Sequence, residues 1–349
     1  MIDNDNHYRS YTAIYEREIQ MKRRYMPRVT ACVMALLFVV VSACSNNSTS
    51  SNESSPSASA QPTKASFPRT IASAKGDITI SKKPERVALV HWGLTQDLLS
   101  FDIPSIGVAL PFTEKQSVLD NAVYKPYTSK FKGIKIVGEN TEVNLEILLQ
   151  YAPDLIIAGT ETNQKVADQL AKIAPTVFLD EKKMDVWNDW QGVMTKFGEM
   201  LGQEDAAKQA IDTFAAKIAQ AKDQLKNVQG SVAYLQVREK QMWLQGTKSA
   251  GHYYEPLGLK PPEQASGGGA ALTLEGLIQI NPDYLFLGYF NYTDTTLPAL
   301  ADEWEKTDVW KTLKAVKNNQ VYKIDGSLAY GYGPISRAYG VDAIVKALK

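Results

Sequence analysis

Apolar residues spaced three or four apart mark two successive helices near the middle of the chain, between residues 185 and 225. The second begins near Glu204 and keeps this spacing to Leu225. On both sides of this block, short β-branched runs alternate with helical segments. The pattern predicts two α/β lobes joined by a stiff helical connector, although helices of one large α/β domain would have the same spacing. The first helix has its apolar positions at Trp187, Trp190, Met194, Phe197 and Leu201, and Gly202 ends it.

An internal repeat favours the two-lobe interpretation. Residues 145–154 and 274–283 share Leu, Glu, Leu, Gln, Pro and Asp in register, 129 positions apart. Each copy has the pattern of a short helix that a Pro ends, followed by a buried strand. We therefore expect an α/β fold of two Rossmann-like lobes, joined by a rigid linker helix, with the ligand cleft between them. The expected boundaries are 67–184 for the N-terminal lobe, 185–202 for the linker helix and 203–349 for the C-terminal lobe.

The N-terminal region has the layout of a secretory signal. A basic stretch from Lys22 to Arg28 precedes an apolar run of 11 residues, Ala31–Val41, which is short for a membrane span. Residues 41–44 resemble the lipobox of bacterial lipoproteins, in which the Cys is lipidated. We expect a signal peptide over 1–43, with Met21 as an alternative start, and a lipid on Cys44. The alternative is a stop-transfer helix with an incidental Cys.

The segment after the expected lipid is a tether. Residues 45–65 are rich in Ser and contain no Leu, Ile, Val or aromatic residue that could be buried in a core, and we assign 44–66 to the lipidated Cys and this flexible tether. The chain's other Cys, Cys32, lies inside the expected signal peptide. The mature body therefore has no thiol for a disulfide or a metal site.

Composition narrows the classes of function. The chain has 38 basic and 38 acidic residues and 44% apolar residues, which is ordinary for a soluble globular protein, and its neutrality argues against a nucleic-acid partner. The sequence lacks the Gly-x-Ser-x-Gly, Walker A, Gly-x-Gly-x-x-Gly and His-Glu-x-x-His motifs, so signals for an enzyme are weak. His91 and His252 are the only His of the expected lobes, too few for a multi-His metal site.

Ligand-binding residues are expected beyond the carboxyl ends of the parallel strands, where ligands bind in α/β sheets. Of the four Arg in the expected lobes, Arg238 alone directly follows a predicted strand, Ser231–Val237. A lone cation among aromatic side chains suits a large, anionic, partly delocalised ligand. A surface salt bridge for Arg238 and lobe packing for each Tyr are the alternatives. The expected ligand-binding residues are Trp92, Thr113, Thr160, Arg238, Tyr289, Asn291, Tyr330 and Tyr332.

Several motifs together resemble the solute-binding lipoproteins of ABC importers for ferric siderophores and cobalamin, the group with a helical linker between its lobes. The resemblance covers about residues 70–349, and the branch for iron(III)-hydroxamates or ferric citrate is the most similar. Its most specific part is Asn144-Leu145-Glu146 together with APDLII at 152–157. The other motifs are PERVALV at 84–90, WGL at 92–94, IGVA at 106–109, IAPT at 173–176 and GSL at 326–328.

The resemblance implies a binding protein, not an enzyme, that captures an iron(III)–siderophore outside the membrane and delivers it to an ABC permease. Iron(III) is then cargo, with no intrinsic cofactor or metal site. The protein is expected to be a monomer, held by its N-terminal lipid on the extracytoplasmic face of the cell membrane, with no nucleic-acid partner. Glu146 and Glu275, the matched acids of the repeat, imply docking onto Arg residues of the permease, although each could simply complement its helix dipole.

Two departures from the family pattern leave the ligand open. The loop after the second strand reads LPFTEK at 110–115, where some hydroxamate binders carry an Arg. Ser266–Gly269 replaces an aromatic residue before a helix of the second lobe. The alternatives are the same fold serving cobalamin, haem or a metal ion, and a membrane-anchored α/β enzyme.

Overall fold

The computed structural model describes residues 66–111, 113–114, 117–290 and 296–349. The expected signal peptide, Cys44, most of the tether and Asn291 lie outside these residues. The described residues belong to one compact unit. Within the described ranges, no helix is both long and apolar enough to cross a membrane.

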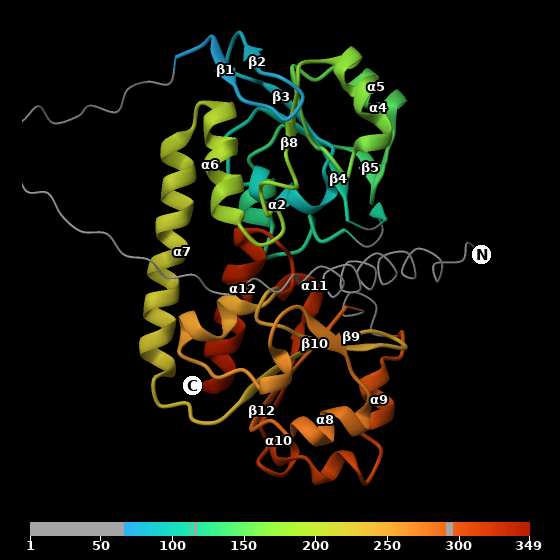
Figure 1. The fold of residues 1–349 in the computed structure, drawn as a ribbon, viewed down its shortest axis with the longest axis vertical. Coiled ribbons are helices and arrows are strands. Elements are labelled where there is room, and N and C mark those ends of the chain that lie inside the picture. The colour runs from blue at the N-terminus through green and yellow to red at the C-terminus, as the bar shows by residue number, and fades with distance from the viewer. Residues whose placement is uncertain (1–65, 112, 115–116, 291–295) are drawn as a thin grey trace, which may run out of the picture. The chain divides into compact units, whose positions relative to one another are not determined.

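The first lobe is built on a six-stranded sheet with the strand order β6-β5-β4-β3-β7-β8 (Figure 1). All neighbours pair in parallel except β6, which runs antiparallel to β5. Its central strands are buried on both faces, as expected for continuous apolar runs in a parallel sheet. The strands are β3 (Arg86–Leu89), β4 (Ser105–Leu110), β5 (Ile134–Glu139), β6 (Glu142–Val143), β7 (Leu155–Gly159) and β8 (Thr176–Leu179), and a separate hairpin joins β1 (Arg69–Ile71) to β2 (Ile78–Ile80).

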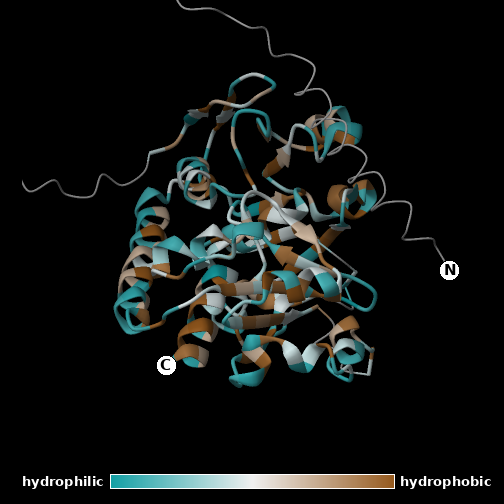
Figure 2. Cartoon of the chain, turned by 60° about the horizontal axis from the view of Figure 1, so that its bottom comes forward, coloured by the Kyte–Doolittle hydropathy of each residue, from teal (hydrophilic) through white to brown (hydrophobic). Residues whose placement is uncertain are grey.

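Helices cover both faces of this sheet. Buried residues of α6 and α2 belong to one apolar cluster, and those of α4 and α5 belong to another. Figure 2 shows hydrophobic residues along the strands and hydrophilic ones on the outward sides of surrounding helices. The helices are η1 (Trp92–Leu94), α2 (Thr95–Leu98), α3 (Lys125–Thr128), α4 (Leu145–Tyr151), η3 (Gln164–Val166), α5 (Ala167–Ile173) and α6 (Trp190–Leu201).

The second lobe has a five-stranded sheet with the order β11-β10-β9-β12-β13. Strands β9, β12 and β13 are parallel, whereas β10 runs antiparallel to both of its neighbours. The strands are β9 (Val232–Val237), β10 (Met242–Gln245), β11 (Gly269–Ala271), β12 (Tyr284–Tyr289) and β13 (Val321–Asp325). The helices are η4 (Gly251–Tyr253), η5 (Glu255–Leu257), η6 (Glu263–Ala265), α8 (Leu274–Ile280), α9 (Leu300–Trp304), η7 (Trp310–Thr312), α10 (Lys314–Lys317), α11 (Gly326–Ala329) and α12 (Pro334–Leu348).

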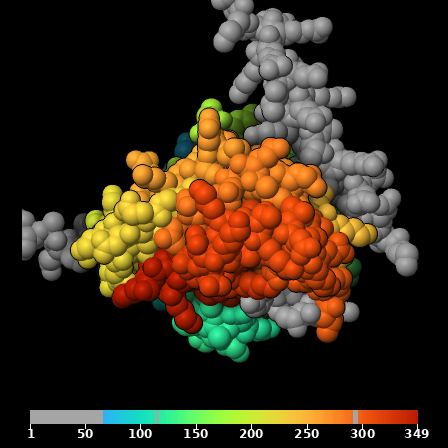
Figure 3. Space-filling model, turned by 90° about the horizontal axis from the view of Figure 1, so that it is seen from below, coloured from blue at the N-terminus to red at the C-terminus, as the bar shows by residue number. Residues whose placement is uncertain are grey.

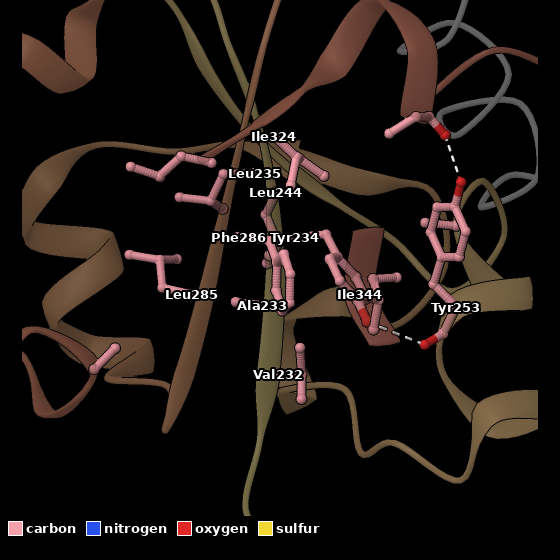
Figure 4. Close-up of a cluster of buried hydrophobic side chains, with 14 of the residues drawn as sticks. Val232, Ala233, Tyr234, Leu235, Leu244, Tyr253, Leu285, Phe286, Ile324 and Ile344 are labelled. Carbon is pink, nitrogen blue, oxygen red and sulfur yellow. Dashed lines mark hydrogen bonds between the residues drawn. The ribbon is translucent and has the colours of Figure 1, made fainter. Parts of the chain in front are cut away.

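Buried tyrosines in the core of the second lobe satisfy their hydroxyls with backbone carbonyls. The Tyr234 hydroxyl donates to the Tyr253 carbonyl at 3.2 Å, and the Tyr253 hydroxyl donates to the Ala329 carbonyl at 2.5 Å (Figure 4). These bonds tie β9, η4 and α11 together inside an otherwise apolar cluster. Such pairing removes the cost of burying an unsatisfied hydroxyl.

The sequence repeat corresponds to a structural repeat. Asp154 accepts hydrogen bonds from the amides of Glu85 and Arg86 at 2.9 and 3.2 Å, at the start of β3. Asp283 accepts one from the amide of Ser231 at 2.8 Å, just before β9. In each lobe the Asp that opens the repeated strand therefore caps the neighbouring parallel strand, which explains why the Pro-Asp pair recurs.

The helix that contacts both lobes is α7 (Glu204–Leu225), which runs alongside them in Figure 1. Ala207 belongs to the apolar cluster of the first lobe, Leu225 to that of the second, and Phe214 packs against both. Viewed from below, α7 (yellow) lies beside the second lobe (Figure 3). This differs from the expected linker at residues 185–202, because α6 instead buries its apolar face in the first lobe. Spacing alone does not distinguish a helix that packs on one lobe from a helix that packs on two.

Candidate ligand-binding site

Three aromatic residues meet where the two lobes come together. Trp92 follows β3 in the first lobe, and its ring centroid lies 5.0 Å from that of Trp187. Tyr332, in the loop before α12 of the second lobe, lies 4.9 Å from Trp187 and 6.1 Å from Trp92. The structure thus brings together the predicted residues Trp92 and Tyr332, with Trp187 between them. A Cβ at Gly93 would lie 2.3 Å from the Trp187 ring, so this packing requires a Gly at position 93.

A buried carboxylate network supports the first-lobe side of this cluster. Glu181 Oε1 lies 3.2 Å from His91 Nε2 and accepts from the Thr162 hydroxyl at 2.7 Å, while Oε2 accepts from the amides of Glu161 and Thr162 at 2.6 and 2.9 Å. Burial acts to raise the pKa of Glu181, but the hydrogen bonds from His91, Thr162 and the amides lower this pKa to about 2. Because the His91 ring also lies 5.1 Å from the Trp187 ring, the network supports the aromatic cluster.

Thr160 belongs to the same network through its hydroxyl. Its Oγ1 accepts from the amide of Glu181 at 3.2 Å. A Cβ at Gly159, one residue earlier, would lie 2.3 Å from the Glu181 carboxylate. Gly288, which lies 129 positions after Gly159 as in the repeat, is likewise covered, because a Cβ there would lie 2.2 Å from the Tyr330 ring. At both positions the absence of a Cβ lets another side chain, Glu181 or Tyr330, pack directly over the backbone of a central strand.

Arg238 belongs to a second group of side chains, directly after β9 of the second lobe. Its guanidinium lies 4.8 Å from the centroid of the Phe290 ring, a cation–π distance. With the Gln236 amide oriented so that its oxygen faces Arg238, Nε and Nη2 donate to that oxygen at 2.9 and 2.8 Å. The Phe290 ring in turn stacks on Tyr330, with centroids 6.4 Å apart. Predicted residues Arg238 and Tyr330 are thus linked through Phe290.

Sequence reasoning missed Trp243, which shares this sheet face. Trp243 on β10 lies directly opposite Gln236 on β9, so its side chain lies on the same face as Gln236 and Arg238. It is 37% exposed, which is unusual for an indole ring in a strand. The sequence Met242-Trp243-Leu244 is continuously apolar, so no alternation in it marks Trp243 as the exposed position.

Two other predicted residues lie apart from Arg238. Tyr289 is opposite Val237 in the ladder, so it points to the other face of the sheet from Arg238, where Lys323 lies 5.5 Å from its ring. There it is buried, and burial raises its pKa to about 12. A position after a strand end predicts proximity to the site, but the two-residue period of the strand decides which face a side chain takes. Thr113 is exposed in the loop after β4.

A side chain of the first lobe caps the last helix of the second. The N-cap residue of α12 is Gly333, which has no side chain. Gln96 of α2 takes that role: its Oε1 accepts from the amide of Ser336 at 3.0 Å, and its Nε2 donates to the Ser336 hydroxyl at 2.8 Å. The Tyr124 hydroxyl lies 3.1 Å from the same Ser336 oxygen. The contact between the lobes is therefore polar and specific at this point.

A buried charged group lies beside this cap. Arg337 donates from Nε to the Tyr332 carbonyl at 2.9 Å and from Nη2 to the Trp187 carbonyl at 3.5 Å, and its Nη1 lies 2.8 Å from His252 Nδ1. One guanidinium thus holds two members of the aromatic cluster by their backbones. Burial, and then the charge of Arg337, lower the pKa of His252 well below its usual value, so this imidazole is neutral.

Asp97 faces the same region from α2. It is 1% exposed, and neither carboxylate oxygen has a hydrogen-bond partner among the described residues. Burial raises its pKa to about 7, against the opposing effect of the Arg337 charge. Sequence reasoning assigned no role to Asp97 or Arg337, since their proximity depends on how the lobes pack.

The matched acids of the repeat occupy equivalent positions. Glu146 and Glu275 are exposed in the first turns of α4 and α8. Side chains cap both helices: the Asn144 side chain accepts from the amide of Ile147 at 3.0 Å, and that of Thr273 accepts from the amide of Gly276 at 3.1 Å. In the described ranges, no group of three His, Cys, Asp or Glu residues is placed to hold a metal ion.

Two α/β lobes spanned by one helix, with aromatic and cationic side chains at their junction, define a bilobal solute-binding protein. The chain belongs to the periplasmic binding protein family, whose model matches residues 87–328. The prediction of a binding protein of this family rather than an enzyme is confirmed, as is the two-lobe α/β fold.

Relatives with known names agree with this assignment. The chain is 30% identical over 329 residues to the iron(3+)-hydroxamate-binding protein YxeB of Bacillus subtilis, covering 90% of this chain and 94% of that protein. It is 29% identical over 313 residues to the Fe(3+)-citrate-binding protein YfmC of the same organism, covering 87% and 91%. Its fold matches the crystal structure of Staphylococcus aureus SirA complexed with staphyloferrin B, with a TM-score of 0.64 and 26% identity over 80% of this chain and 98% of that chain.

Proposed function

We propose that this chain is the substrate-binding component of an ABC importer, and that it captures an iron(III)–siderophore outside the membrane and delivers it to the permease. The observation that carries the proposal is the position of Arg238, a cation over the Phe290 ring, on the same sheet face as Trp243. The names of the relatives, which bind iron(III)-hydroxamate and ferric citrate, point to the same class of ligand.

The chemistry of these side chains suits a chelated metal rather than a bare one. Arg238 offers planar donors to carboxylate or hydroxamate oxygens at the surface of a complex, and aromatic rings offer apolar area to its organic shell. Iron(III) is cargo in this proposal, already coordinated by the siderophore. The proposed binding residues are Trp92, Trp187, Arg238, Trp243, Tyr330 and Tyr332, with Thr113 and Thr160 at the margin of the first lobe.

The proposal also covers how the protein is held at the membrane and how it meets the permease. We propose that Cys44 carries the lipid that holds a monomer at the extracytoplasmic face, with the Ser-rich segment as a flexible tether. Glu146 and Glu275 are proposed to meet basic residues of the permease. The signal-like pattern before Cys44 and the equivalent exposed positions of the two acids support these assignments.

Tryptophan fluorescence provides the test, because three of the proposed binding residues are Trp. The mature chain is titrated with a ferric hydroxamate, ferric citrate, a ferric catecholate, cobalamin, haem and Zn²⁺. Saturable quenching by at least one ferric siderophore, at lower concentration than by the other three probes, is the expected result. Saturation only by cobalamin, haem or Zn²⁺ would show that the protein binds that ligand instead of a ferric siderophore, while it would still be a solute-binding protein. Absence of saturation by every ferric siderophore would refute the proposal.

A further inference from the structure

A chain of polar side chains runs along one face of the second-lobe sheet, behind Arg238. Gln236 on β9 lies two residues before Arg238, so both side chains are on the same face. The amide of Gln245 on β10 lies 3.1 Å from that of Gln236, and the Ser249 hydroxyl lies 3.2 Å from the Gln245 amide on its other side. This hydroxyl also donates to the Gly246 carbonyl at 3.3 Å. The side chains of Arg238, Gln236, Gln245 and Ser249 therefore form one hydrogen-bonded row, which we call the amide row.

The charge of Arg238 sets the direction of the amide row. Because Nε and Nη2 of Arg238 donate to the Gln236 oxygen, the Gln236 nitrogen faces the Gln245 amide. Two N–H groups cannot bond to each other, so the Gln245 oxygen accepts from Gln236 and the Gln245 nitrogen donates to the Ser249 hydroxyl. Every donor then points away from the guanidinium, and both amide dipoles have their negative ends toward it. Hydrogen bonds aligned in this way strengthen one another.

The end of the amide row away from Arg238 is fixed to the core of the lobe. Gln245 is 7% exposed, and its backbone carbonyl accepts from the hydroxyl of buried Tyr254 at 3.0 Å. A Cβ at Gly246 would lie 2.2 Å from the backbones of Gly267 and Gly269, so the chain after Gln245 is closely packed. An amide buried at position 245 has a desolvation cost that an apolar residue avoids. Packing alone therefore does not explain Gln245, whereas support of a nearby cation does.

We propose that Gln245, acting through Gln236, is a positioning residue that holds the Arg238 guanidinium in its ligand-binding orientation. The inference rests on the proposed function and adds to it the side chains that orient its cation. The Phe290 ring supports one face of the guanidinium, and Gln236 bonds the edge formed by Nε and Nη2. Turning the guanidinium would break both of these hydrogen bonds. The conformational entropy of the Arg238 side chain is therefore lost when the protein folds rather than when it binds a ferric complex.

The first test measures the support of Arg238 without any ligand. Hydrogen exchange of the Arg238 Nε–H group is followed by ¹⁵N NMR on the mature chain, and the signal is assigned by its loss in Arg238→Ala. Gln245→Leu, which cannot accept from Gln236, should speed this exchange roughly threefold or more. Ser249→Ala, at the exposed end of the amide row, should act in the same direction but less, and it serves as the test if Gln245→Leu folds poorly. An exchange rate that neither variant changes would overturn the inference.

The second test measures affinity through quenching of tryptophan fluorescence by ferric citrate and by a ferric trihydroxamate. Gln245→Leu should weaken binding about three- to tenfold, because the guanidinium is no longer held in place. Gln245→Glu still offers an oxygen to Gln236 and should bind normally. Gln279→Leu, the same substitution at an exposed position of α8, is the matched control and should also bind normally.

A double variant separates positioning from a general effect on the fold. The loss of affinity caused by Gln245→Leu should vanish in the Arg238→Ala background, since the two changes then act on the same contact. A loss that persists in that background, or unchanged binding by Gln245→Leu alone, would overturn the inference. If the unmodified chain binds no ferric siderophore, the proposed function is refuted instead, and the exchange measurement alone decides whether Gln245 positions Arg238.

Discussion

Replacing Asp97 by Asn should change how stability depends on pH. Burial raises the pKa of Asp97 from its ordinary 3.8 to about 7. Because each pKa unit corresponds to about 1.4 kcal/mol, the charged form fits the folded state less well than the neutral form by about 4 kcal/mol. An acid whose pKa is higher in the folded state than in the unfolded state favours folding most when it is protonated in both states, which for Asp97 means below about pH 4. Its contribution is lost as the pH rises toward and through 7.

The amide introduced by Asp97→Asn resembles the neutral acid at every pH. The free energy of unfolding of Asp97→Asn, relative to the unmodified chain, should therefore rise between pH 4 and pH 8 by about 4 kcal/mol. The donors of the amide lower the variant's stability equally at all pH values, so the change with pH is the diagnostic quantity.

Urea unfolding followed by tryptophan fluorescence measures this difference at several pH values. Asp120→Asn, at an exposed position of the same lobe, is the control and should show no such trend. Groups that titrate in both proteins cancel when the variant is compared with the unmodified chain. If the two stability curves for Asp97→Asn and the unmodified chain run parallel from pH 4 to pH 8, Asp97 is not held neutral by burial and the reasoning fails.

Three further substitutions test the site and its support. Arg238→Ala should weaken siderophore binding more than tenfold, with Arg238→Lys intermediate, and unchanged titration curves would place the guanidinium outside the ligand contact. Gln96→Ala should lower the free energy of unfolding by about 1–2 kcal/mol because α12 loses its cap, and an unchanged urea midpoint would argue against that bond. Glu181→Gln should lower the melting temperature at neutral pH, where the carboxylate is ionised. Because the pKa of Glu181 is about 2, the decrease in melting temperature should become smaller as the pH falls toward 2. A decrease that stays the same at every pH would contradict a stabilising role for the ionised carboxylate.

Local signals predicted the elements that local chemistry determines. Each copy of the repeat forms the predicted short helix and following strand, and the side chains of Asn144 and Thr273 cap those helices within the first turn. Sequence reasoning assigned no strand to the segments that form β5 and β11. The backbones of Gly246 and Gly269 approach too closely for a Cβ, which is why this strand contains Gly.

Features that depend on packing between distant segments could not be predicted in this way. The connecting role of α7, the burial of Tyr289 on the sheet face opposite to Arg238, and the group of Asp97, Arg337 and His252 all arise from contacts between segments far apart in the chain. For the candidate site, strand ends predicted Trp92, Arg238, Tyr330 and Tyr332, which stay predictions, while Trp187 and Trp243 became candidates only through the packing of the lobes and the strand pairing.

The capping of α12 by Gln96 has a consequence for how the molecule assembles. The Ser336 amide in the first turn of the last helix is capped by a side chain 240 positions earlier, so this amide gains its partner only once Gln96 of the first lobe is in place. The N-terminal lobe thus supplies a hydrogen-bond partner that the last helix needs. A protein that emerges N-terminus first across a membrane would keep this helix incomplete until synthesis is finished, and its two lobes would then mature as a single cooperative unit rather than as independent domains.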